Sequence, residues 1–302
     1  MAIAFVPESV PIALAASLTI TTNIMRNPCK TLKTAQNQMY ATDCSLGTKA
    51  ITTIVAAADM ITSRQKGHDN NIMQLRAVVG LCNAGEFDAT LIHLTLHARE
   101  INGHATYQAI LRFSKSLGPV QELVQMWRKW VEIPFDSQNK LMIRVFSAMD
   151  EKSLSVILPP LVVAQHDCKN DMLLTMKCGP GVLIGRCESC ILEGRTSCIL
   201  DNETRAIPLD IKDSWCSQDK RVILFAPKAL PESGIAIVPA SNASEEEAMK
   251  HVLPSLTPVG LVAIKNTPRR EIPHVVRTLR RVGIRLFVAT GDFKLMAQAI
   301  AQ

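Results

Sequence analysis

Two short motifs carry residues that could do chemistry on phosphates or cations. Thr290-Gly-Asp292 follows an apolar run, so a hydroxyl, a tight turn and a carboxylate stand at the expected carboxyl end of a strand. Near the start of the chain, Glu8 lies between Pro7 and Pro11 within an apolar stretch. Proline breaks a helix and frees carbonyls, and a carboxylate on such an unwound segment is typical of cation sites in transporters. The chain therefore predicts a phosphate-facing loop near one end and a cation-binding carboxylate near the other.

A third group of reactive side chains is the cysteines. Cys187 and Cys190 form one C-x-x-C pair, with Cys178 and Cys198 nearby. A structural zinc site usually needs two such pairs, so we favour ordinary thiols and keep zinc as the alternative. The apolar start lacks the basic region of a secretory signal, which indicates a reducing compartment for the chain's 9 cysteines.

The elements that must position the C-terminal motif are typical of an α/β protein. Between Gly260 and Asp292, an apolar run, a proline-bounded amphipathic segment and a second apolar run predict strand, helix and strand. This is half of a doubly wound unit. The helix and its exit carry a basic run, Arg277, Arg280, Arg281 and Arg285. No aromatic residues interleave with that run, so a solvated helix face is favoured over nucleic-acid binding.

The middle of the chain predicts a mixed α/β domain. Residues 103–116 have helical spacing, and 172–176 and 221–225 are typical of strands. Residues 130–135 and 140–146 alternate like an antiparallel pair around a polar turn. The acidic stretch 241–250 suits a surface helix or linker. At 302 residues with 47% apolar content, the chain can hold two domains with real cores.

Four segments in this order resemble the P-type cation-transporting ATPases, most closely the sodium/potassium-pump α-subunit branch. They are Val6-Pro-Glu8, residues 131–140, residues 173–180 and Thr290-Gly-Asp292. The resemblance implies a mixed α/β nucleotide-binding domain inserted in an incomplete Rossmann-like (HAD-type) phosphorylation domain, preceded by one apolar helix.

The resemblance also sets expected domain boundaries. Residues 1–25 correspond to the fourth transmembrane helix, and 26–62 to the first part of the phosphorylation domain. Residues 63–255 form the nucleotide-binding domain, and 256–302 the second, truncated part of the phosphorylation domain. A membrane location is implied by the family, with residues 1–25 as the expected contact, and a cytoplasmic or membrane-peripheral location is the alternative for this fragment.

The nucleotide site implied by the resemblance matches the family pattern better than the other implied sites do. Phe135 matches the aromatic that stacks on adenine, Lys140 and Lys177 match lysines that line the pocket, and Arg221 matches an arginine on the phosphates. Stacking and basic groups are physically sensible for ATP. The alternative is that Phe135 is a core aromatic and that the lysines are solvated.

Several positions depart from the family pattern around this site. Tyr107 stands where the family has a Glu near the adenine amino group, Met142 replaces a Gln and Cys178 replaces a Gly. Before the basic helix, Arg269 is kept as a nucleotide contact, but Asn266 replaces the family Asp. We expect these replacements to weaken the selectivity for ATP over other ligands more than they weaken ATP binding itself.

The phosphoryl acceptor implied by the resemblance is Asp43. Thr53-Ile-Val55 supports this register, since it falls where the family has Met-Thr-Val. Cys44 replaces the neighbouring lysine, Ser45 a threonine and Leu46 a glycine. Phosphoryl transfer depends on positioning and charge neutralisation, so we expect these changes to impair it.

The remaining family groups lie outside this sequence. The segment that holds Mg²⁺ in the family would follow residue 302, which leaves Asp43, Thr290, Gly291 and Asp292 as the catalytic candidates. One carboxylate, Glu8, cannot form a cation cage alone. Three functions follow: a pump-like ATPase unable to transport by itself, a non-catalytic nucleotide-binding accessory module, or an inactive relic.

Overall fold

A computed structural model describes residues 35–47, 50–63, 68–135, 140–149, 158–167, 170–191, 197–231, 254–286 and 298–299. The chain divides into two compact units. The larger comprises Asn37–Asn266 with Phe287–Gln302, and the smaller Met1–Gln36 with Thr267–Leu286. Each unit is described by itself.

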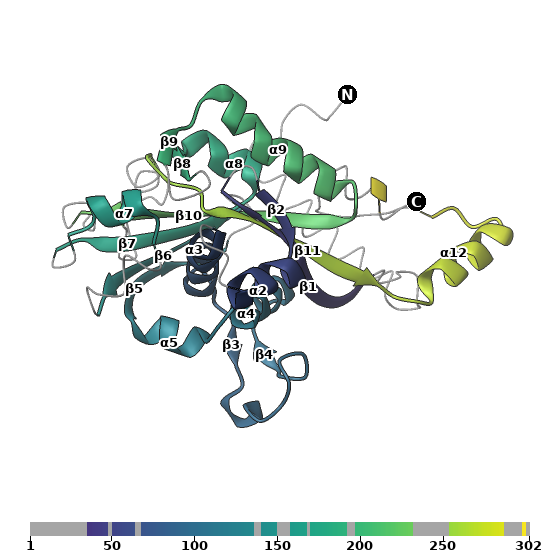
Figure 1. Ribbon diagram of the computed structural model, residues 1–302. Coiled ribbons are helices and arrows are strands. Elements are labelled where there is room, and N and C mark those ends of the chain that lie inside the picture. The colour runs from purple at the N-terminus through teal and green to yellow at the C-terminus, as the bar shows by residue number, and fades with distance from the viewer. Residues whose placement is uncertain are drawn as a thin grey trace, which may run out of the picture. The chain divides into compact units, whose positions relative to one another are not determined.

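A seven-stranded sheet forms the centre of the larger unit (Figure 1). Its strands lie in the order β2-β1-β11-β10-β7-β6-β5. Every pair whose register is described is antiparallel. The bounds are β1 Ala35–Leu46, β2 Ala50–Thr53, β5 Trp127–Ile133, β6 Leu141–Ala148, β7 Met172–Cys178, β10 Lys220–Leu230 and β11 Gly260–Pro268. Two short hairpins pair β3 (Glu86–Phe87) with β4 (Ile101–Asn102) and β8 (Ser189–Ile191) with β9 (Ser197–Ile199).

Helices cover both faces of this sheet, with α3 and α4 on one side and α8 and α9 on the other (Figure 1). The described helices of the larger unit are α2 Ile54–Ser63, α3 His68–Leu81, α4 Ala105–Ser116, α5 Val120–Gln125, α7 Pro160–Gln165, α8 Pro180–Leu183 and α9 Asn202–Cys216, with short 3₁₀ turns at Ala89–Leu91 and Ile184–Arg186.

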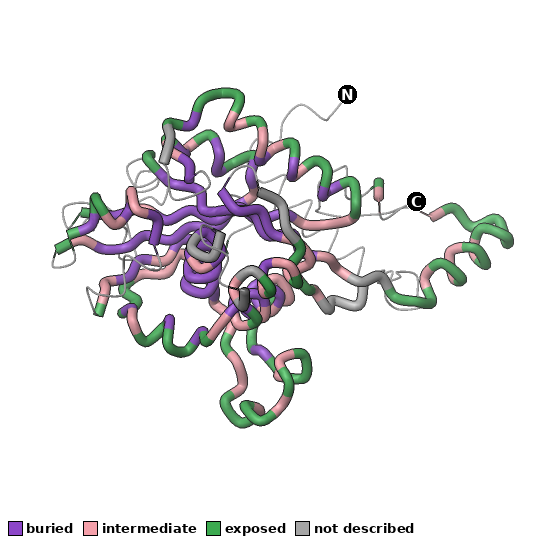
Figure 2. The backbone as a smooth tube through the Cα atoms, in the orientation of Figure 1, coloured by how far each residue is buried: buried purple, intermediate pink, exposed green. Residues whose placement is uncertain are grey.

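Strand β10 shows why the sheet is covered on both sides. Val222 and Leu224 face the cluster that contains Trp215 of α9, while Ile223 and Phe225 face the cluster beneath α3 and α4. Successive strand residues point to opposite faces, so a run that is apolar at every position must be buried on both. Figure 2 shows the buried strands of the sheet, with α3 also largely buried and α9 exposed along part of its surface.

Most of the elements predicted for the middle of the chain are confirmed. The helical spacing of 103–116 corresponds to α4, and the antiparallel pair corresponds to β5 and β6, which meet with Ile133 opposite Ile143. The strands predicted at 172–176 and 221–225 are longer in the structure, as β7 and β10.

Three strands from the flanking regions, β1, β2 and β11, lie in the same sheet as the strands of the middle region. β11 is the strand predicted from the apolar run that begins at Gly260, and it pairs antiparallel with β10. The Rossmann-like phosphorylation domain remains a prediction, because residues 287–297, which would carry its next strand, lie outside the described part.

The smaller unit contains one described helix, α12 (Ile272–Arg281). Pro273 stands in its first turn, where the missing N–H has no intrahelical partner in any case, and Arg280 and Arg281 stand in its last turn. This confirms the helix predicted from the proline-bounded basic run. Within the described ranges, no helix has the length and apolarity to cross a bilayer. The apolar helix predicted over residues 1–25 lies outside them.

Candidate functional site

The centre of the candidate site is a buried lysine on strand β7. Lys177 is only 3% exposed, and it lies between Met142 of β6 and Phe225 of β10 in the sheet register. Its ammonium nitrogen is 4.1 Å from the centre of the Tyr107 ring and has no hydrogen-bond acceptor among the described residues. Burial lowers the pKa of Lys177 from 10.5 to about 8. A buried cation with unused donors is poised to bind an acceptor.

Tyr107 reaches this lysine from the first turn of α4. The chain just after α3 holds it there, because the Asn83 side chain donates to the Tyr107 carbonyl at 3.0 Å and accepts from the Gly85 N–H at 2.9 Å. The backbone N–H of Phe135 donates to the Tyr107 hydroxyl. The ring is therefore fixed from two sides, and its face is presented to the ammonium group.

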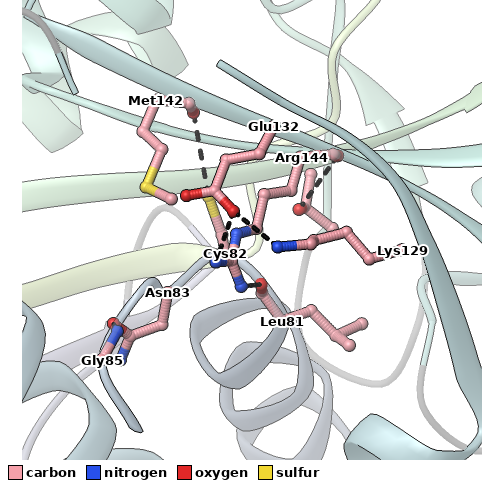
Figure 3. A network of polar contacts seen from close by, with 9 residues as sticks. Leu81, Cys82, Asn83, Gly85, Lys129, Glu132, Met142 and Arg144 are labelled. Atoms are coloured by element: carbon pink, nitrogen blue, oxygen red, sulfur yellow. Dashed lines mark hydrogen bonds and ion pairs between the residues drawn. The ribbon is translucent and has the colours of Figure 1, made fainter. Parts of the chain in front are cut away.

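An ion-pair network lies on β5 and β6 (Figure 3), and the charges of its Glu132 and Arg144 act on Lys177. Glu132 accepts from Arg144 at 2.7 Å and from Lys129 at 2.9 Å, and Arg144 also donates to the Leu81 carbonyl at 3.2 Å. Burial pushes the pKa of Glu132 upward, but the hydrogen bond from Lys129 and the charge of Arg144 outweigh it and lower the pKa overall. The carboxylate is thus engaged with two cations, and Lys177 makes no ion pair with it.

Cys82 closes the buried side of the site. Its thiol donates weakly to the Met142 carbonyl at 3.8 Å, and burial raises its pKa. A thiol that stays protonated is a weak nucleophile, so Cys82 contributes packing rather than covalent chemistry.

Phe135 follows β5, and Lys140 directly precedes β6. Phe135 is about half exposed, and Lys140 is exposed with a left-handed backbone φ of 55°. An exposed aromatic ring at the end of a strand is available for stacking on a flat ligand. The core-aromatic alternative for Phe135 is therefore wrong.

Arg221 lies at the same end of α4. It comes from β10, and its guanidinium contacts the Thr106 hydroxyl at 3.4 Å. Since Thr106 and Tyr107 are in the first turn of α4, Arg221 adds a cation where the helix already presents backbone N–H groups.

Asp43, the predicted phosphoryl acceptor, lies inside strand β1 rather than in a loop. Its carboxylate accepts from the Lys220 ammonium group at 2.7 Å, and both side chains are 15% exposed. Lys220 also donates to Gln218 at 2.9 Å. The neighbouring Cys44 is fully buried, and burial, followed by the Asp43 charge, raises its pKa to about 12. A cation therefore stands beside Asp43, although it comes from β10 and not from the next residue.

The sequence-predicted residues separate into three groups. Lys177 and Phe135 contact Tyr107, and Arg221 contacts the neighbouring Thr106. Lys140 directly precedes β6. Asp43 pairs instead with Lys220, the residue before Arg221 on β10. Arg269 belongs to the smaller unit, where its guanidinium lies 3.8 Å from Glu271. Glu8, Thr290, Gly291 and Asp292 lie outside the described residues.

Sequence reasoning missed the partners of the basic residues. Glu132, Arg144, Cys82 and Lys220 were not predicted. Glu132 and Arg144 face each other across β5 and β6, so an opposite-charge pair could have been found once the register of that hairpin was fixed. No such local signal links Lys220 to Asp43, which are 177 positions apart.

Two of the cysteines considered for zinc, Cys187 and Cys190, are described at the start of the β8 region. Cys187 and Cys190 are both buried, and the Cys187 thiol donates to the Leu183 carbonyl at 3.3 Å. Within the described ranges, no three His, Cys, Asp or Glu side chains are arranged to hold a metal ion.

The residues that form most of the sheet and the site around Lys177 match a known protein family. Residues 71–271 match the family model "P-type ATPase, cytoplasmic domain N". The chain belongs to the P-type ATPase family. This match covers β5, β6, β7 and β10 together with α3 and α4, the elements that carry Lys177, Tyr107, Phe135 and Arg221. The resemblance inferred from the motifs is confirmed.

Two curated relatives place this P-type ATPase on the sodium/potassium-pump side of the family. The "Sodium/potassium-transporting ATPase subunit alpha-A" of Artemia franciscana is 28% identical over 230 residues, which is 76% of this chain and 21% of that protein. The "Sodium/potassium-transporting ATPase subunit alpha-1" of Oreochromis mossambicus is 28% identical over 229 residues, 76% of this chain and 20% of that protein. The chain spans about a fifth of the length of these relatives.

Proposed function

We propose that this chain binds ATP at the site around Lys177, as the nucleotide-binding part of a P-type ATPase. The observation that carries the proposal is the Lys177 ammonium group, buried over the Tyr107 ring with no acceptor among the described residues. A buried charge is normally paired, so this one is expected to gain most from an anionic ligand.

The neighbouring groups support a nucleotide in particular. Phe135 offers a half-exposed ring on which a base can stack, while Arg221 stands beside the first turn of α4 and can reach phosphate oxygens. Glu132 is engaged by Arg144 and Lys129, so it does not neutralise Lys177 in advance. The relatives are named ATPases, which agrees with this ligand.

Lys177→Met tests the proposal. Methionine keeps the length of the side chain and removes the charge, so the variant should fold with equal or higher stability while ATP binding falls at least tenfold. Calorimetric titration with ATP and the thermal shift on adding ATP measure the two effects. Lys115→Met, at the far end of α4, is the control and should bind ATP like the original chain.

Two outcomes separate the candidate functions. ATP binding that is lost in Lys177→Met and in Phe135→Ala supports the nucleotide-binding module. If the original chain shows no heat and no thermal shift with ATP, the proposal fails and the inactive-relic alternative is favoured.

A second proposal concerns phosphoryl transfer to Asp43. The ion pair with Lys220 favours it, since a cation beside the acceptor offsets charge that develops during transfer. The described residues do not provide a set of ligands for Mg²⁺ at Asp43, so we derive no step through that ion. A hydroxylamine-labile phosphate from ATP that disappears in Asp43→Asn supports the proposal, and its absence in the original chain contradicts it.

The relatives are named for sodium and potassium transport, and the part that matches this chain is about a fifth of their length. We propose that this chain does not pump by itself and keep the accessory, regulatory role as the alternative. Flux into vesicles that contain only this chain is the measurement, and cation uptake driven by ATP would contradict the proposal.

A further inference from the structure

Trp130 is an exposed indole held in a fixed position at the edge of the main sheet. Its side chain is 54% exposed, while Trp127 and Trp215 are only 5% and 4% exposed. The indole N–H donates to the Ser147 hydroxyl at 2.9 Å, and the Arg128 guanidinium lies 5.1 Å from the ring centre. The ring's one polar group is therefore satisfied internally, and the rest of its exposed surface is apolar.

Apolar and basic side chains continue this surface. Met149, which follows β6, is 65% exposed, and its N–H donates to the Met126 carbonyl at 2.8 Å, next to the start of β5. Arg128 and Lys129 are both exposed. We call Arg128, Lys129, Trp130 and Met149 the β5 edge patch.

The charge of the patch is positive. Lys129 and Arg144 share the single carboxylate of Glu132, and Arg128 stacks on Trp130. When Arg144 and Glu132, which lie beside the patch, are included, three positive side chains stand against one carboxylate. This net positive charge suits a negatively charged surface.

The geometry of the edge argues against an added peptide strand. β5 is the last strand of the sheet, but its pairing with β6 shifts register between Lys129 and Val131, so Trp130 is the extra residue of a bulge. A bulge twists an edge and interrupts its row of free backbone groups, which disfavours strand addition. An indole with a thioether and two cations needs no such backbone pairing to enter the headgroup region of a bilayer.

We propose that the β5 edge patch binds the surface of an anionic lipid bilayer, with Trp130 at the headgroup boundary and Arg128 and Lys129 on the lipid phosphates and carboxylates. The patch shares Lys129 with the Glu132 network on β5 and β6, but it includes none of Lys177, Tyr107, Phe135 and Arg221, so lipid binding does not require ATP.

The test uses the full chain and vesicles of about one-third phosphatidylserine in phosphatidylcholine. Tryptophan emission should shift to the blue on binding and be quenched by lipids with brominated chains, because Trp130 is the exposed tryptophan among the described residues. Trp130→Phe should abolish both signals while its unfolding temperature is unchanged. The variant Arg128→Gln with Lys129→Gln should bind more weakly by about five-fold for each charge removed.

A charge-matched control removes Arg280 and Arg281 of α12 by Arg→Gln substitution and should bind like the original chain. The proposal is overturned if this control loses binding while the β5 edge variant keeps it. It is also overturned if brominated lipids do not quench, or if the chain ignores vesicles and binds soluble polyglutamate, which would indicate an acidic protein partner.

Discussion

The Lys177 ammonium nitrogen lies 4.1 Å from the centre of the Tyr107 ring, and this contact replaces the ion pair or hydrogen bonds that a buried lysine usually makes. The lysine comes from a strand in the middle of the sheet and the tyrosine from a helix that covers it. Their contact ties the two layers together at the point where we propose that ATP binds.

The lowered pKa of Lys177 makes stability depend on pH. The folded value of about 8 lies below the ordinary 10.5, a gap worth roughly 3 kcal/mol. Between these values the unfolded chain binds more protons, so the free energy of unfolding should rise with pH through this window. Urea unfolding measures the free energy of unfolding of the original chain and of Lys177→Met. The two chains have the same cysteines, so thiol titration cancels, and the difference in their free energies of unfolding should shrink from pH 8 to 10.5. Parallel curves would contradict the buried ammonium.

Replacement of Tyr107 separates its ring from its hydroxyl. Tyr107→Leu removes the ring face and leaves the ammonium group buried, so a loss of about 2 kcal/mol or more is expected. Tyr107→Phe keeps the ring and loses only the hydrogen bond from the Phe135 N–H, about 1 kcal/mol. Equal losses in thermal or urea unfolding would show that the cation–ring contact contributes nothing.

Glu132 and Arg144 should be strongly coupled. A double-mutant cycle with Glu132→Gln and Arg144→Met is expected to give an interaction energy of about 1–3 kcal/mol, since their 2.7 Å contact is largely shielded from water. Lys129→Gln is the matched control: its side chain is about half exposed, so the change should stay within about 0.5 kcal/mol. The idea fails if Lys129 couples to Glu132 as strongly as Arg144 does.

The Asp43–Lys220 pair predicts a link between β1 and β10. Asp43→Asn and Lys220→Met should each destabilise the chain by about 1–2 kcal/mol, and the double variant by less than the sum. The Gln218→Ala control removes the second contact of Lys220 and should have the smaller effect. Additive losses would show that the two charges act independently.

Metal removal should leave the fold unchanged. Burial raises the pKa of Cys187 to about 12, whereas a zinc ligand must be a thiolate. We expect the unfolding temperature to be the same with and without a chelator, and thiol reagents to label Cys187 only after unfolding. A lower unfolding temperature in the presence of the chelator would instead support a structural zinc site at these cysteines.

The sequence alone predicted local elements well because each has its own periodicity. Val222, Leu224 and their neighbours form an unbroken apolar run typical of a strand buried on both faces, and β10 is such a strand. Four motifs in the same order, two of them in residues 131–140 and 173–180, predicted the family. They could not give the bulge at Trp130, since one extra residue in a strand leaves the hydrophobic pattern almost unchanged.

The sequence by itself determined which residues are basic, aromatic or apolar, several strands and helices with clear periodicity, and which family the chain resembles. Only the tertiary structure decided that Lys177 meets Tyr107, that Glu132 is already engaged, and that Lys220 pairs with Asp43. The physical reason is that local periodicity is set by backbone geometry within a few residues. Contacts between distant residues depend instead on strand order and helix packing, which cannot be read from local patterns in the sequence.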